Sequence, residues 1–100
     1  MILEIATFDI KADSIEQFMG ACEEAKAVVS MAKGFQGLEF QHCLETKTKF
    51  VVLISWETIE DHTIGFRESE LFVQWRAILS PFFNNPPVAE HFKCITILNK

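Results

Sequence analysis

The sequence predicts a single α+β domain over residues 1–100, with its elements in the order β-α-β-β-α-β. Segments with strand patterns alternate with segments of helical spacing in that order. A second observation is that the chain is short for the number of large apolar side chains it carries. Of its residues 49% are hydrophobic, and they include ten Phe and two Trp. A chain this short leaves much of its surface exposed. The surplus of large apolar side chains therefore favours self-association over the alternative, a core unusually rich in Phe.

The first predicted elements are a strand and a long amphipathic helix. Residues 2–10 are rich in β-branched and aromatic residues, as strands are. Asp13 and Ser14 are each followed three residues later by Glu or Gln, which gives two overlapping capping boxes. We expect a helix of about five turns that ends at Gly34. Its apolar stripe comprises Ile15, Phe18, Met19, Cys22, Ala25, Val29 and Ala32.

The next two runs predict a β-hairpin. Residues 35–45 alternate between apolar and polar side chains, and residues 46–48 are polar and turn-like. Residues 49–57 form a nearly continuous apolar run, which predicts burial on both faces of that strand. One face of the first hairpin strand carries Leu38, Phe40, His42 and Leu44.

The second helical region is broken in two. Thr58 is the expected cap of a short helix, and Gly65 weakens its end. Ser69 restarts a helix that we expect to end near Ser80, before a proline. Residues 84–87 read as a loop, and residues 88–98 as the last strand. The short helix is expected to turn Ile59, His62, Thr63 and Phe66 inward, and the longer one Phe72, Trp75, Leu79 and Phe82.

This order is the ferredoxin-like split βαβ pattern. Right-handed crossovers place both helical layers on one face of a four-stranded antiparallel sheet. The opposite face would be bare, although the third strand is apolar throughout. A second copy of the chain is the expected cover, so the sequence predicts a homodimer that forms an α/β barrel.

Charge and composition argue against several classes of protein. The net charge is −5 and the basic residues are scattered, which disfavours nucleic-acid binding. No apolar run approaches the roughly 20 residues of a membrane span. The N-terminus lacks the features of a signal peptide, and three widely spaced cysteines suggest free thiols, so we expect a cytoplasmic protein. No spacing predicts a metal, flavin or other cofactor.

His62 is the candidate catalytic residue. On an inward helical face, an imidazole could act as a general base or donate a hydrogen bond to a bound oxygen. The alternative is a hydrogen-bonded core histidine. His91 could line the same cavity or bond across the dimer, and alternation leaves both readings open. For His42 we expect a structural or interface role.

The expected substrate-binding residues are aromatic. Phe66, Phe72, Trp75 and Trp56 would wall a cavity between helices and sheet, and Trp75 could stack on a ring. Both tryptophans could equally be plain core. The two arginines of this region, at positions 67 and 76, are expected to pair with Glu68, Glu70 or solvent.

Several short motifs occur in a characteristic order along the chain. They are Gly34-Phe35-x-Gly37, the run 52–57, Asp61-His62, Phe66-Arg67-x-Ser69, Phe72-x-x-Trp75-Arg76 and Pro87-Val88-x-x-His91-Phe92. With these motifs the chain resembles the antibiotic biosynthesis monooxygenase domain family of the dimeric α/β-barrel superfamily. The resemblance covers nearly the whole chain.

The resemblance implies a cofactor-independent monooxygenase that acts on a small, aromatic or quinol-type molecule. The alternatives are a non-catalytic binding or structural domain, or a proton-transfer reaction such as isomerisation. Haem-degrading relatives use an Asn, a Trp and a His, and the first strand here has no Asn. The other two positions align near Gly65 and Trp75, so haem degradation is not expected. Because the chain has no Tyr, a phenolic proton donor is excluded.

Overall fold

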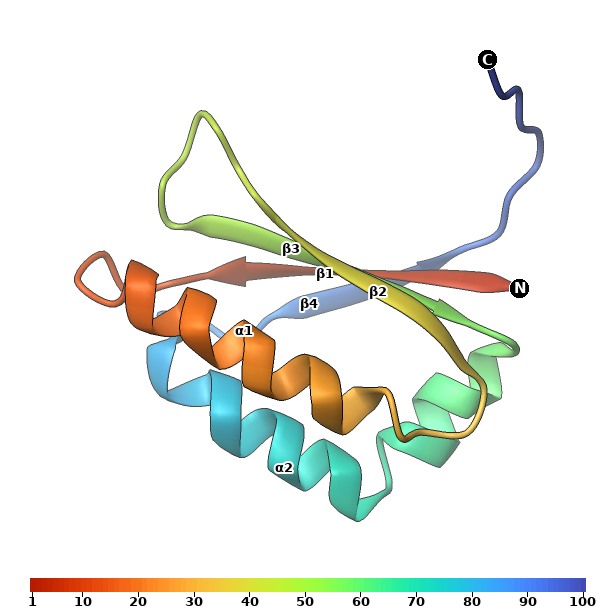
Figure 1. Cartoon of the computed structure of the whole chain (residues 1–100), viewed down its shortest axis with the longest axis horizontal. Coiled ribbons are helices and arrows are strands. Elements are labelled where there is room, and N and C mark those ends of the chain that lie inside the picture. The colour runs from red at the N-terminus through yellow and green to blue at the C-terminus, as the bar shows by residue number, and fades with distance from the viewer.

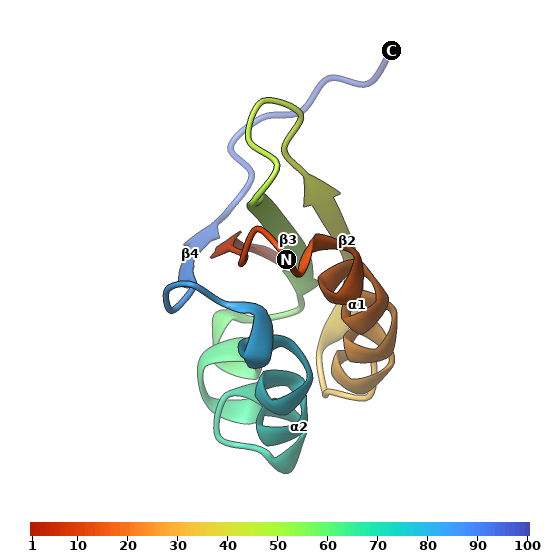
Figure 2. The same cartoon turned by 90° about the vertical axis from the view of Figure 1, so that its left-hand side faces the viewer.

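A four-stranded antiparallel sheet in the order β2-β3-β1-β4 forms one layer of the protein. The computed structural model describes all 100 residues. Both helices lie against the same face of the sheet, and the other face is bare (Figures 1 and 2). The predicted fold is therefore confirmed. The elements are β1 (Ile2–Asp9), α1 (Ile15–Val29), β2 (Phe35–His42), β3 (Lys49–Trp56), η1 (Asp61–Phe66), α2 (Glu70–Leu79), η2 (Ser80–Phe82) and β4 (Val88–Phe92).

The core lies between the sheet and the helices, and aromatic rings fill much of it. Phe18 of α1 is fully buried, with its ring centroid 5.6 Å from that of Phe8 and 4.9 Å from that of Phe50. Leu79 of α2 is also fully buried. Part of the phenylalanine surplus is thus accounted for by the core of one chain.

The two faces of the central strands differ in burial. On β3 the side chains of Phe50, Val52, Ile54 and Trp56 face the helices and are buried. The alternate residues, among them Val51 and Leu53, are only half-buried on the outer face. The expected burial of this strand on both faces is therefore wrong for a single chain, because nothing in the chain covers the outer face.

Two strands end earlier than predicted, and pairing explains the end of β4. Leu3 pairs with Phe92, so β1 has almost no residues left to pair with anything beyond Phe92. Residues 93–98 were expected to continue the strand, and instead they leave the sheet as an extended tail (Figure 1). The predicted strand over 35–45 stops at His42, and Leu44 is 94% exposed.

Helix α1 is also shorter than predicted. It spans 15 residues and ends at Val29, about one turn before the expected end. Ser14 occupies the N-cap position, but its hydroxyl donates to Asp13 Oδ1 at 3.0 Å and caps no backbone N–H. The predicted capping boxes are therefore wrong, although the start of the helix is right.

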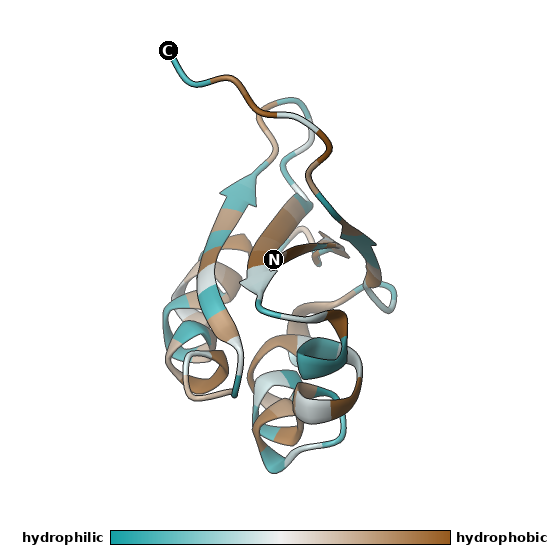
Figure 3. Cartoon of the chain, turned by 90° about the vertical axis from the view of Figure 1, so that its right-hand side faces the viewer, coloured by the Kyte–Doolittle hydropathy of each residue, from teal (hydrophilic) through white to brown (hydrophobic).

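Apolar residues remain exposed on the sheet and on the tail. Val88 and Phe92 of β4 are 66% and 46% exposed. Figure 3 shows hydrophobic stretches along the strands and in the C-terminal segment, where Ile95, Ile97 and Leu98 are 75–96% exposed. None of the helices is long and apolar enough to span a membrane.

Gly34 has a structural role that a side chain would destroy. Its φ is +82°, and a Cβ at this position would collide with the Asp61 carboxylate. We expect Gly34→Ala to lower the free energy of unfolding by about 2 kcal/mol, because αL strain and the clash add. Gly20→Ala is the control, since a Cβ there meets nothing within 4 Å and alanine favours the helix. Urea unfolding of both variants checks this, and equal stability would contradict it.

Candidate functional site

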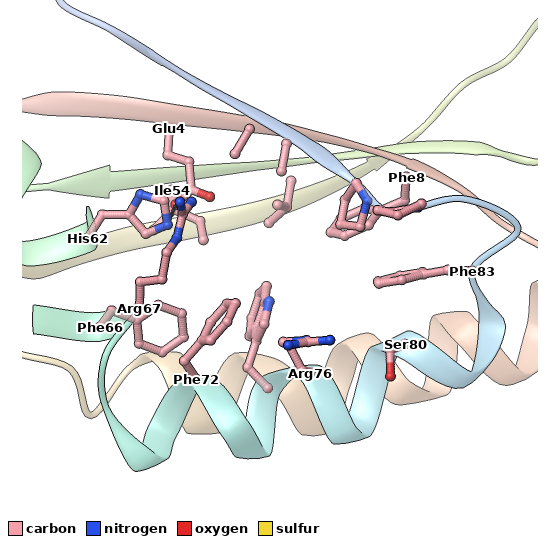
Figure 4. Close-up of a pocket in the computed structure, with 16 residues that line it drawn as sticks. Glu4, Phe8, Ile54, His62, Phe66, Arg67, Phe72, Arg76, Ser80 and Phe83 are labelled. Carbon is pink, nitrogen blue, oxygen red and sulfur yellow. Dashed lines mark ion pairs between the residues drawn. The ribbon is translucent and has the colours of Figure 1, made fainter. Parts of the chain in front are cut away.

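A cavity of about 660 Å³ opens between the sheet and α2 (Figure 4). Its sides come from the inward faces of β1, β3 and β4, from η1 and the residue after it, from α2 and η2, and from the loop before β4. The lining residues are Glu4, Ala6, Phe8, Val52, Ile54, His62, Phe66, Arg67, Phe72, Trp75, Arg76, Ser80, Phe83, Pro86, Pro87 and Ala89. A mainly apolar cavity of this volume fits a small organic molecule.

The short segment η1 fixes His62 in this cavity. Thr58 Oγ1 accepts from the Asp61 N–H at 3.1 Å, and Asp61 Oδ2 accepts from the Thr58 N–H at 3.2 Å, which closes a capping box. The segment then widens into a π-helical turn, in which the Arg67 N–H donates to the His62 carbonyl at 2.9 Å. Ile59 was expected inward and is 38% exposed.

His62 itself is buried, with only 2% of its surface exposed. Its ring stacks on the Trp56 indole at a centroid distance of 5.5 Å and an interplanar angle of 23°. The predicted inward position of His62 is therefore confirmed. Its role in catalysis remains a prediction.

His62 is the centre of a chain of hydrogen-bonded side chains. Trp56 Nε1–H donates to Glu4 Oε1 at 2.9 Å, and His62 Nε2 lies 3.3 Å from the same oxygen. On its other side, His62 Nδ1 lies 2.7 Å from Nε2 of His91. Strand pairing explains the last contact, since His91 is directly opposite Glu4 in the sheet and shares its inward face. This series of hydrogen-bonded side chains runs from the core to the half-buried His91.

Burial controls the protonation of Glu4 and His62. It lowers the pKa of His62 to about 4, with the positive charge of Arg67 and the neighbouring His91 adding to the effect. Burial also raises the pKa of Glu4, against the opposing effects of the Trp56 hydrogen bond and Arg67. The close contact of Glu4 with His62 is therefore one between a carboxyl group and a neutral imidazole at neutral pH. Such an imidazole donates from one nitrogen and accepts at the other.

Glu4 has one oxygen that the protein leaves free. Trp56 and His62 both contact Oε1, whereas Oε2 makes no hydrogen bond to the protein. No buried side-chain oxygen or nitrogen lacks a partner, so Oε2 must reach accessible space. Figure 4 shows the carboxyl group of Glu4 directed into the cavity beside His62. A buried carboxylate with a raised pKa and one free oxygen is suited to accept a proton.

Sequence reasoning missed Glu4. It sits on the inward side of β1, with Ala6 and Phe8 as the next inward residues. A lone carboxyl at an otherwise apolar inward position was the available signal, because ionisable side chains are rarely buried without a partner.

The predicted substrate-binding residues are only partly brought together. Phe66, Phe72 and Trp75 line the cavity as expected. Trp56, predicted as a wall, is fully buried behind His62 and does not line it, because its indole packs on the imidazole and bonds Glu4. His91 contacts the site through His62 and is not a lining residue.

Two arginines line the cavity without acidic partners. The only ion pairs within 4.0 Å are Lys26–Glu23 and His62–Glu4. Of the partners expected for Arg67 and Arg76, the two glutamates are therefore ruled out and solvent remains, since both arginines are exposed. Both arginine side chains face the cavity (Figure 4), where they are available to a ligand.

The described side chains offer no metal site. No three His, Cys, Asp or Glu residues gather where they could hold a metal ion.

Cys22 is buried, which raises its pKa to about 12 and keeps the thiol protonated. His42 lies outside the cavity, stacked on Phe50 and with its Nε2 2.8 Å from the Lys47 carbonyl, and its structural or interface role stays a prediction.

Comparisons with known proteins agree with this fold. The family model of the antibiotic biosynthesis monooxygenases matches residues 1–78. The Bacillus subtilis protein YczJ, which is uncharacterized, is 37% identical over 93 residues, which are 93% of this chain and 98% of YczJ.

Solved structures show the same architecture. A protein from Bordetella bronchiseptica, assigned to the antibiotic biosynthesis monooxygenases, is 25% identical with a TM-score of 0.92, over 95% of this chain and 97% of that one. SnoaB, a cofactor-independent oxygenase from Streptomyces nogalater, is 11% identical with a TM-score of 0.84, over 99% and 97% of the two chains. At that identity the likeness to SnoaB shows the fold alone.

Proposed function

The chain belongs to the antibiotic biosynthesis monooxygenase family, and from that premise we propose that it is a cofactor-independent monooxygenase acting on a small, aromatic or quinol-type molecule. One observation carries the proposal. A buried carboxyl group, with one oxygen free, opens into an apolar cavity and is bonded through His62 to a second histidine near the surface.

The cavity suits an aromatic substrate. Trp75, Phe66 and Phe72 present ring surfaces to it, and the volume of about 660 Å³ lies within the usual range for small-molecule sites. Trp75 is held in place by stacking on Phe40 at a centroid distance of 6.0 Å, with an interplanar angle of 18°. A flat ligand would therefore bind against a wall that is already ordered.

The first chemical step in the proposal is proton removal. Oε2 of Glu4 accepts a proton from the substrate, and His62 stabilises the carboxyl group on the other side. Rotation of the protonated carboxyl group brings its O–H to Nε2 of His62, which accepts that proton while Nδ1–H gives its own proton to Nε2 of His91. His91 is half-buried, so it connects this path to solvent. His62 thus acts as a proton relay, while Glu4 is the base that meets the substrate.

The second step is oxidation by dioxygen. The substrate anion transfers one electron to O₂, and recombination of the two radicals forms a carbon–oxygen bond. Loss of water from the resulting hydroperoxide converts a CH₂ group into C=O. One oxygen atom of O₂ enters the product and the other leaves in water, so the substrate supplies all the electrons. Desolvation and fixed orientation are the protein's contributions to this step.

The rival function, a purely structural domain, predicts a space filled by Phe side chains. Four Phe residues line the cavity and still leave it open. Glu4 adds a second argument, because burying a carboxyl group is costly and a structural domain gains nothing from it. Both observations favour a site that binds and transforms a ligand.

Oxygen uptake by the purified protein tests the proposal. With a panel of hydroquinones and anthrones, and with no added flavin, haem or metal, we expect uptake of one O₂ for each carbonyl formed from an anthrone CH₂. The same assay in the presence of a chelator is the control for trace metal. If no member of the panel is consumed faster than in protein-free buffer, the proposed reaction is refuted.

We also propose that two copies associate through the outer face of the sheet. Leu3 and Ile5 of β1 and Val51 and Leu53 of β3 form a half-buried apolar patch on that face. Val88 and Phe92 extend it at the edge, where they are largely exposed. An apolar surface of this kind is unusual for a monomer and supports a homodimer.

A further inference from the structure

The charge of the cavity is opposite in sign to that of the protein. The chain has 14 acidic and nine basic residues and a net charge of −5. Among the cavity-lining residues, however, Glu4 is the only acid, and Arg67 and Arg76 are both present. Even with Glu4 ionised, the two guanidinium groups outnumber it, so the lining residues carry a net positive charge.

The two arginines occupy different ends of the cavity. Arg67 follows η1 and lies beside Glu4 and His62, where its charge acts on both groups (Figure 4). Arg76 projects from α2 near Ser80, beneath Phe83 (Figure 4). Glu4 therefore partly balances Arg67, whereas no carboxylate approaches Arg76 within 4.0 Å.

Arg76 and Ser80 together form a group of free hydrogen-bond donors. They are four residues apart on one continuous helical stretch and so project from the same face. The guanidinium carbon of Arg76 lies 6.0 Å from the centroid of the Phe72 ring, which holds the head group against the cavity wall. The Ser80 hydroxyl makes no hydrogen bond to another protein group.

We propose that the cavity binds an organic anion, with a ring-containing body between the aromatic walls and an oxyanion group held by Arg76 and Ser80. The oxyanion is a carboxylate or a phosphate, the groups that a guanidinium recognises through paired hydrogen bonds. Its place is the end of the cavity away from Glu4. The proposal rests on the proposed function only in assigning the reacting group of the ligand to the Glu4 end.

Such a ligand carries two features at opposite ends of one ring system. A hydroxyl or acidic C–H meets Glu4, and the oxyanion meets Arg76. A hydrogen bond to a charged group is stronger than a neutral one, although solvent weakens it at an exposed arginine. We therefore expect the oxyanion to tighten binding about tenfold over a neutral analogue of the same shape.

Calorimetric titration with three matched probes tests this without any need for turnover. The probes are 6-hydroxy-2-naphthoate, its methyl ester and 6-hydroxy-2-naphthyl phosphate. We expect the carboxylate or the phosphate to bind about ten times more tightly than the ester, and the tighter of the two identifies the oxyanion. In Arg76→Gln this preference should disappear.

Lys26→Gln is the matched control, because it removes the same charge from an exposed site on α1 that does not line the cavity. It should keep the full preference. Equal binding of anion and ester, a preference that survives in Arg76→Gln, or no binding of any probe would overturn the proposal. Anion binding without oxygen uptake would refute the proposed oxygenase reaction and leave the anion site standing. Oxygen uptake without a preference for the anion would refute the anion site and leave the oxygenase reaction standing.

Discussion

Replacing Glu4 by glutamine is expected to lower quinol turnover about 10²–10⁴-fold, the usual contribution of a general base. The amide has the size of the carboxyl group, and its oxygen can still accept from Trp56 Nε1, which now donates to Glu4 Oε1 at 2.9 Å. It cannot accept a proton from the substrate at neutral pH. Steady-state oxygen uptake, measured on the variant and the parent protein at equal concentration, gives the ratio.

Stability of the same samples separates a catalytic role from a structural one. Glu4→Gln removes a buried ionisable group and keeps its packing, so the free energy of unfolding should be unchanged or higher. His62→Ala should behave differently, because it leaves the bonding atoms of Glu4 and His91 without their partner. We expect this variant to lose activity and also about 1–3 kcal/mol of stability. Full activity in Glu4→Gln would remove Glu4 from the mechanism.

The pH profile gives a further check on Glu4. Burial raises the pKa of this carboxyl group, and only its ionised form accepts a proton. Activity should therefore fall as the pH is lowered through the raised pKa of Glu4. His62, with its pKa lowered to about 4, stays neutral over the neutral range and does not produce this limb. The profile of kcat/KM reports the group in the free protein.

Local patterns predicted the fold well because the period of each segment is clear. The β-branched and aromatic composition identified β1, alternation with period two identified β2, and helical spacing identified the buried face of α2, including Trp75 and Leu79. The predictions failed where tertiary contacts decide the outcome. The last strand stops at Phe92 because β1 has no further residues to pair with, and sequence periodicity carries no information about the length of a partner.

The candidate site was predicted in part for the same reason. His62 follows from its spacing on a short helix, and its burial agrees with that spacing. Glu4 and His91 lie 87 residues apart in the sequence, and only strand pairing places them opposite each other. The hydrogen-bonded chain through His62 is thus a product of sheet topology. The sequence also left open whether Arg76 pairs with Glu68, Glu70 or solvent, because the answer depends on which carboxylates approach it in space.

The second prediction with a large expected effect concerns dimer formation through the outer face of the sheet. Leu53 lies at the middle of β3 and pairs with Ile5, so its side chain is near the centre of the apolar patch. In a homodimer through this face it would be desolvated by the partner copy. A charged side chain at that point would have to be buried without a partner, which costs several kcal/mol. Leu53→Lys is therefore expected to convert a dimer into a monomer.

Sedimentation equilibrium at micromolar concentration measures this directly. The parent protein should sediment at twice 11.5 kDa and Leu53→Lys at 11.5 kDa. Val73→Lys is the matched control, because Val73 is 58% exposed on α2, on the helical side of the protein, and the same substitution there should leave the dimer intact. Because Leu53 is only half-buried in the single chain, the variant should keep its fold, which circular dichroism can verify. A parent protein that sediments as a monomer, or a Leu53→Lys variant that remains dimeric, would show that the two copies do not meet through this face.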